Sequence, residues 1–213
     1  MGSLASLEAL RPAWASAEGL QRRTPEILHG SGRELELVID RTRVDVDGRG
    51  ARAVTINGTI PGPMLRYQVG DDLIIHVDNR LDEDTSLHWH GILLPTDQDG
   101  VPGLTFDGIP AGSRFTYRYP LVQNGTYWYH SHSGFQEQLG MYAPLIIDPA
   151  EPQVEYDREH VILLGDWTFE DPYRIMARLK KHPDYYNNQR RTLFDFFRDA
   201  ADDGLGAAVS DRL

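Results

Sequence analysis

Two histidine pairs have the spacing and the surroundings of metal ligands. His88 and His90 flank Trp89, and His130 and His132 flank Ser131. In a β-strand, residues two apart point to the same face, with their Cβ atoms about 6–7 Å apart. That spacing is wide for one ion and suits two neighbouring ions. Two such strands side by side would present four imidazoles on one surface, and imidazole binds copper, zinc, iron and nickel.

The alternative is that these histidines are isolated polar residues on a sheet face. Their strands are strongly apolar and aromatic, and burying four imidazoles without a ligand is costly. We therefore interpret the four as metal ligands. The other histidines have no partner at ligand spacing, and we predict that they are structural or solvent-facing: His29, His76, His160 and His182.

Composition excludes several classes of function. The chain of 213 residues has a formal charge of -11, and so acidic a surface repels nucleic acid. It contains no cysteine, which excludes disulfides, thiolate zinc sites, a cysteine nucleophile and a blue-copper centre within this chain. No apolar run reaches the roughly 18–20 residues that a membrane span requires.

Alternating apolar and polar residues predict β-structure from about Glu34 to Asp148. Turn signals such as Asn57-Gly58 and Asn124-Gly125 separate short segments, which favours an antiparallel sandwich or barrel. The predicted strands are 34–40, 53–57, 73–79, 86–93, 114–120, 126–132 and 143–148.

The pattern changes after Pro149. Val161 to Trp167 is typical of one more buried strand. Asp171-Pro172 predicts the start of a helix that runs to about Lys181. A second helix is expected from about Thr192 to near Gly204, and its apolar face requires a cover. We therefore expect the chain to end inside a domain.

Three stretches of the sequence resemble the first cupredoxin domain of multicopper oxidases. They are NGTIPGPMLRYQVGDDLIIHVDNRL, HWHG and GTYWYHSHSGFQEQLGMYAPLIIDP. HSHSGFQEQLG and the later DWTFEDPYRIMARLKK are similar to the bacterial copper-resistance (CopA-type) branch. The resemblance covers about Glu34 to Leu213. It implies a mainly β fold: a Greek-key cupredoxin-like β-sandwich over 34–150, then 151–213 as a linker, first strand and helical insertion of an incomplete second domain.

The resemblance also implies a role for each ligand. His88 matches the ligand of a type 2 copper, His90 and His130 match ligands of one type 3 copper, and His132 matches a ligand of the other. In the family these ions bind dioxygen and reduce it to water with electrons from a reducing substrate. Asp99 matches an acidic residue that passes protons towards the cluster; the alternative is an ordinary turn aspartate before Gly100.

Other residues beside the ligands favour packing over chemistry. Trp89, Trp128, Tyr127 and Tyr129 could relay electrons, but alternate residues of a strand must fill its opposite face, so we expect core positions. Gln136, Gln138 and Met141 follow the second motif. Met141 could be a soft copper ligand, although a lone methionine is far more often packing.

Without a cysteine, this chain alone is not expected to have the oxidase activity of its family. A complete oxidase also supplies His-x-x-His-x-His and His-Cys-His motifs, and neither is present. We expect an N-terminal part of a periplasmic copper oxidase that does not turn over alone. The alternative is a non-enzymatic copper-binding protein that uses the same four histidines. Residues 1–33 are expected to be a disordered tail or a signal-peptide remnant.

Overall fold

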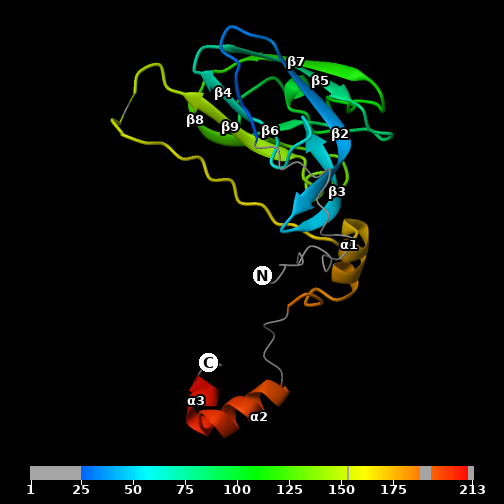
Figure 1. Ribbon diagram of the computed structural model, residues 1–213, viewed down its shortest axis with the longest axis vertical. Helices are drawn as coiled ribbons and strands as arrows, with labels where there is room; N and C mark the ends of the chain where they lie inside the picture. The colour runs from blue at the N-terminus through cyan, green and yellow to red at the C-terminus, as the bar shows by residue number, and fades with distance from the viewer. Residues whose placement is uncertain (1–24, 153, 188–192, 211–213) are drawn as a thin grey trace, which may run out of the picture. The chain divides into compact units, whose positions relative to one another are not determined.

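The computed structural model describes residues 25–152, 154–187 and 193–210 (Figure 1). The chain divides after Phe169 into two compact units. The first unit contains all the strands, and the second contains all the α-helices. None of the described helices is long and apolar enough to cross a membrane.

The first unit is a sandwich of two β-sheets. One sheet has the strand order β1-β4-β9-β8-β6, and the other has the order β3-β2-β5-β7 (Figure 1). The mainly β sandwich expected from the sequence is therefore confirmed. The strands are β1 (Ile27–His29), β2 (Leu35–Val46), β3 (Arg49–Ile56), β4 (Met64–Gln68), β5 (Asp72–Asn79), β6 (His88–His90), β7 (Arg114–Pro120), β8 (Gly125–His130) and β9 (Tyr142–Asp148).

The core lies between the two sheets and follows from the alternation along the strands. In β5, Leu73, Ile75 and Val77 are fully buried, whereas the side chains between them are only half-buried. One face of each such strand therefore packs inward, and the other is free for polar contacts. The predicted strand 73–79 matches β5, but β1 and β4 were not predicted. β1 lies within the segment expected to be a tail, of which residues 1–24 are outside the described residues.

The strands that carry the histidine pairs are fixed by their inward faces. Trp89 of β6 lies opposite Tyr129 of β8, and both are fully buried. The Tyr129 hydroxyl donates to the Pro63 carbonyl at 2.6 Å, and the Trp89 ring packs edge-on against Tyr117 at 5.2 Å. β6 spans only three residues and is an edge strand, so these contacts hold it in place.

The predicted strand from Val161 to Trp167 is wrong. The segment is extended but forms no ladder with any described strand, and Ile162 and Leu164 are 81% and 90% exposed. Its apolar run is typical of a buried strand, yet a strand requires a hydrogen-bonded neighbour. Three contacts tie the stretch 159–169 to the sandwich: the Arg66–Glu159 ion pair, Gln138 Nε2 donating to the Asp166 carbonyl, and Arg49 over the Phe169 ring.

The second unit is helical. α1 (Pro172–Lys181) begins as predicted, because the Asp171 side chain accepts a hydrogen bond from the Tyr173 backbone at 2.9 Å. α2 (Leu193–Asp202) confirms the second predicted helix. Gly204 has a positive φ of 88° and separates α2 from α3 (Leu205–Ser210), a short helix that was not predicted.

Asn79 provides a test of how the sandwich supports its loops. Its side chain is 2% exposed, donates to the carbonyls of Glu83 and Ile109 at 2.9 Å each, and accepts from Leu81. Asn79→Ala would leave these buried groups unpaired, so we expect a loss of about 1–3 kcal/mol in the free energy of unfolding. Urea denaturation measures it.

The matched control is Asn124→Ala, because Asn124 is exposed. It should change the free energy of unfolding by less than about 0.5 kcal/mol. Equal losses in the two variants would contradict the supporting role of Asn79.

Candidate metal centre

The four predicted ligands converge at the end of β6 and β8. In this antiparallel pair His88 lies opposite His130, and His90 lies opposite Trp128. His132 follows two residues after β8, where its backbone N–H donates to Ser86 Oγ at 3.1 Å. The ring centroid of His88 lies 4.7 Å from that of His132, 5.4 Å from that of His130 and 5.5 Å from that of His90.

The ring nitrogens have the spacing of ligands to shared ions. Ligand atoms of His88, His90 and His130 all lie within 4.8 Å of one another. His90 Nδ1 and His130 Nε2 are 3.2 Å apart. Two nitrogens that each lie about 2.0 Å from one ion, at a tetrahedral angle, are about 3.3 Å apart. His90 and His130 are therefore placed to hold one ion between them.

The opposite nitrogens of two of these rings are already bonded. His88 Nδ1 lies 2.8 Å from the backbone oxygen of Asp99 and 3.3 Å from its carboxylate. His130 Nδ1 lies 2.7 Å from Glu137 Oε2 and 3.1 Å from the backbone oxygen of Ser131. When Nδ1–H donates to oxygen, Nε2 keeps its lone pair for a metal, which is the usual arrangement around metal-binding histidines. The donor set therefore fits a copper ion.

Burial favours the neutral, metal-binding form of the rings. His130 is 4% exposed, and desolvation lowers its pKa although the Glu137 carboxylate acts in the opposite direction. Desolvation also lowers the pKa of His132, and the nearby His88 ring adds to the effect. A metal binds only deprotonated imidazole, so a lowered pKa keeps these ligands available at neutral pH.

Trp128 corrects one expectation from the sequence. Trp89 and Tyr129 fill the core, as predicted, but Trp128 lies on the face of the histidines. Its ring stacks on His130 at 4.0 Å with an interplanar angle of 13°, and on His90 at 5.0 Å. Strand alternation carried this signal, because Trp128 and His130 are two residues apart. Trp128 therefore sets the planes of two ligands.

The loop after β8 holds Gln136, which the sequence placed after the second motif without a role, and Glu137, which no motif identified. Gln136 is 4% exposed, and its Oε1 accepts hydrogen bonds from Thr85 and Ser131 at 2.6 and 2.8 Å. Met141 is fully buried, with its sulfur 3.4 Å from Thr85 Oγ1, which confirms its packing role. Glu137, beside Gln136, contacts His130 and was not singled out by spacing.

The remaining histidines lie apart from this cluster. His76, on the other sheet, has its two ring nitrogens 2.8 Å from Thr116 and from Glu34. His29, His160 and His182 are exposed. All four therefore have the structural or solvent-facing positions that were predicted.

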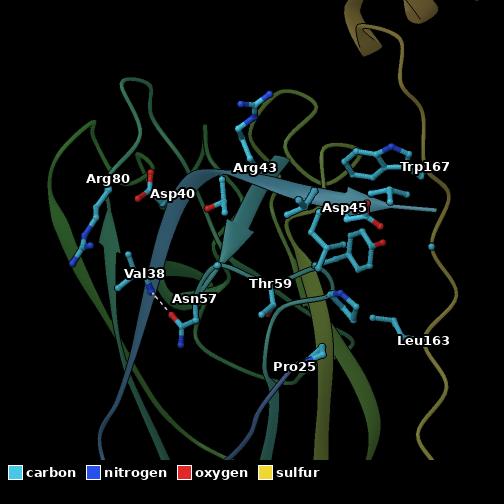
Figure 2. Close-up of a pocket in the computed structure, with 18 of the residues that line it drawn as sticks. Pro25, Val38, Asp40, Arg43, Asp45, Asn57, Thr59, Arg80, Leu163 and Trp167 are labelled. Carbon is cyan, nitrogen blue, oxygen red and sulfur yellow. Dashed lines mark hydrogen bonds between the residues drawn. The ribbon is translucent and has the colours of Figure 1, made fainter. Parts of the chain in front are cut away.

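A separate hollow lies along β2 and the turn that follows β3 (Figure 2). Residues of β2, the turn around Thr59, and Leu163 and Trp167 line it. Its side chains are a mixture of carboxylates, arginines and apolar groups, and none of the four clustered histidines is among them. The hollow is therefore distinct from the metal centre.

The turn that bonds His88 depends on Gly100. Its φ is +74°, and an added Cβ would lie 1.9 Å from the Leu87 carbonyl oxygen. Gly100→Ala must therefore displace either the Asp99 turn or the start of β6. We expect a loss of more than about 2 kcal/mol in the free energy of unfolding, above the 1–2 kcal/mol of backbone strain alone. Denaturant titration measures it.

Gly103→Ala is the matched control. Gly103 also has a positive φ, of 113°, but an added Cβ would meet nothing within 4 Å. Gly103→Ala therefore measures the backbone strain of a positive φ without a steric clash. A Gly103→Ala variant as unstable as Gly100→Ala would show that the close approach to Leu87 is unimportant.

Known proteins resemble both the sequence and the sandwich. The family profile described as "Multicopper oxidase" matches residues 38–152. The copper resistance protein A homolog of Pseudomonas syringae pv. tomato is 53% identical over 202 residues, which cover 94% of this chain and 33% of that protein. Copper resistance protein A of Escherichia coli is 51% identical over 182 residues, 85% of this chain and 30% of that protein.

A solved structure of a mutant laccase from B. aclada matches with a TM-score of 0.65 and 39% identity, over 75% of this chain and 29% of the laccase. This chain spans about a third of the length of the relatives it matches. Its sandwich is the cupredoxin-like domain of such proteins. The chain therefore belongs to the multicopper oxidase family, in the copper-resistance branch.

Proposed function

We propose that this chain is the N-terminal part of a copper-dependent oxidase and supplies half of the ligands of its trinuclear copper site through His88, His90, His130 and His132. The observation that carries the proposal is the 3.2 Å separation between His90 Nδ1 and His130 Nε2, in a cluster whose other two imidazoles lie beside them. Membership of the multicopper oxidase family supports copper as the metal.

The proposal assigns each ligand to one ion. His90 and His130 would share one type 3 copper, which their nitrogen spacing supports. His88, with its Nδ1 bonded to the Asp99 backbone, would offer Nε2 to the type 2 copper. His132 would serve the second type 3 copper. The bound copper ions would supply the binding of dioxygen and its reduction to water.

Asp99 is proposed as the residue that holds and passes protons beside the cluster. Its carboxylate lies 3.3 Å from His88 Nδ1, and its side chain is 38% exposed. It therefore contacts both solvent and a ligand ring, which is the position that proton transfer requires. Its backbone oxygen also orients His88, so the same residue would serve two roles.

The activity, substrate and compartment of the whole oxidase are part of this proposal. The relatives named copper resistance protein A support a role in copper homeostasis. Dioxygen and a reducing substrate as partners, and the periplasm as compartment, are proposed from the family resemblance alone. The proposed division is a cupredoxin domain over 34–150 and the start of a second domain over 151–213. The 213 residues contain no cysteine, so type 1 copper ligation requires a thiolate from elsewhere.

A non-enzymatic copper-binding role is the second candidate. The grouping of His88, His90 and His130 within a single chain favours it, because three imidazoles hold a copper ion without further domains. The two candidates share the metal and differ in whether the four histidines form part of the catalytic site of a larger oxidase.

Copper titration tests the ligand set. Saturable copper binding is expected for the wild-type chain, and His90→Ala and His130→Ala should each weaken it by at least about tenfold, since a ligand contributes no less than the groups that orient it. Competition with a chelator of known affinity measures this.

His160→Ala is the control, because His160 is exposed and outside the cluster. If His160→Ala lowered the copper affinity as much as His90→Ala and His130→Ala, the proposed ligand set would be contradicted.

Oxygen uptake tests the expectation, common to both candidates, that this chain does not turn over alone. With a phenol and added copper, we expect the chain to consume oxygen no faster than free copper does, because it has no thiolate for type 1 copper. Rapid four-electron reduction of dioxygen to water by this chain would refute that expectation.

A further inference from the structure

A carboxylate that the oxidase proposal does not use lies directly behind one ligand. Glu137 Oε2 is 2.7 Å from His130 Nδ1, whereas the other acceptor, the Ser131 backbone oxygen, is at 3.1 Å. His88, in contrast, has the backbone oxygen of Asp99 as its nearer partner. The nearest outer partner is therefore a backbone oxygen at His88 and a carboxylate at His130.

We infer that Glu137 is a positioning residue that holds His130 as the Nδ1–H tautomer and leaves its Nε2 to the metal. The inference rests on the proposed copper site and adds a carboxylate–histidine–metal arrangement to it. A carboxylate partner makes the imidazole a stronger electron donor and orients its ring. In other proteins the loss of such a partner lowers metal affinity by about 10–100-fold, and we expect a loss of the same order here.

The ring of His130 requires such a partner, because stacking alone leaves its orientation undetermined. Trp128 lies nearly parallel to the ring at 4.0 Å and fixes its plane. A 180° flip within that plane would exchange the ring nitrogens for carbons and keep the stacking. Only one of the two flips places Nδ1 against Glu137 and Nε2 at 3.2 Å from His90.

Hydrogen bonds and close packing against the sandwich fix the loop that carries Glu137. The backbone oxygen of Gln136 accepts from Met141 at 3.0 Å, and that of Glu137 accepts from Gly140 at 2.9 Å. The buried Gln136 side chain anchors the same turn. At Gly140, with a φ of +114°, an added Cβ would lie 2.4 Å from Ile60 Cδ1. The turn is therefore held closely against the sandwich, and Glu137 projects from it to His130.

The tautomer can be measured without any metal. In two-bond ¹H–¹⁵N correlation spectra of the metal-free protein, His130 should be the Nδ1–H tautomer. Glu137→Ala should convert this to a mixture of tautomers, because only the more distant Ser131 oxygen remains as acceptor. Glu137→Gln should retain the tautomer, because its amide oxygen still accepts a hydrogen bond.

Copper competition gives the second measurement. Glu137→Ala should weaken copper binding by about tenfold or more, and Glu137→Gln by less. Glu155→Gln is the control: Glu155 is exposed, and the change removes the same charge outside the metal centre. It should leave the His130 tautomer and the copper affinity unchanged.

Each outcome decides between the inference and the oxidase proposal. A single unchanged tautomer in Glu137→Ala overturns the positioning role, whether or not the affinity falls, and leaves the four proposed ligands standing. A changed tautomer in a protein that binds no copper overturns the copper site and supports the positioning of His130. A changed tautomer together with weakened copper binding supports both.

Discussion

The register between β6 and β8 is the constraint on which the proposed metal centre depends. It places His88 opposite His130 and Trp89 opposite Tyr129. A slip of one residue would turn the imidazoles into the apolar core and bring the two aromatic rings to the surface. β6 has only three residues, so its few ladder hydrogen bonds cannot fix the register alone. The buried Trp89–Tyr129 pair and the hydrogen bond from the Leu87 backbone to the Tyr117 hydroxyl do so.

The two faces of the β6–β8 pair have different roles. The inward face contributes apolar burial, and the outward face presents the imidazoles. Separate partners hold these imidazoles: the Asp99 turn contacts His88, Trp128 and Glu137 contact His130, and Ser86 bonds the backbone of His132. A metal site requires ligands held within a fraction of an ångström, and side chains on paired strands with bonded outer nitrogens satisfy that requirement.

Much of this arrangement could be predicted from periodicity. Alternation identified β5 and β7 within a residue or two, and the His-x-His spacing identified the four clustered imidazoles. β4 escaped because it is short, follows a proline-glycine turn and pairs in parallel with β9, about 80 residues away. The prediction for the segment 161–167 failed for the opposite reason: its apolar run is typical of a buried strand, but no described strand lies beside it. The Glu137 contact depends on a turn held by Gln136 and Gly140, which residue spacing does not show.

A crystal structure of the copper-loaded chain, with anomalous diffraction recorded at the copper absorption edge, tests the central claim most directly. We expect an anomalous peak within coordination distance of both His90 Nδ1 and His130 Nε2, with Glu137 still bonded to His130 Nδ1. Copper bound only at other histidines or at surface carboxylates, with the cluster at β6 and β8 empty, would contradict it.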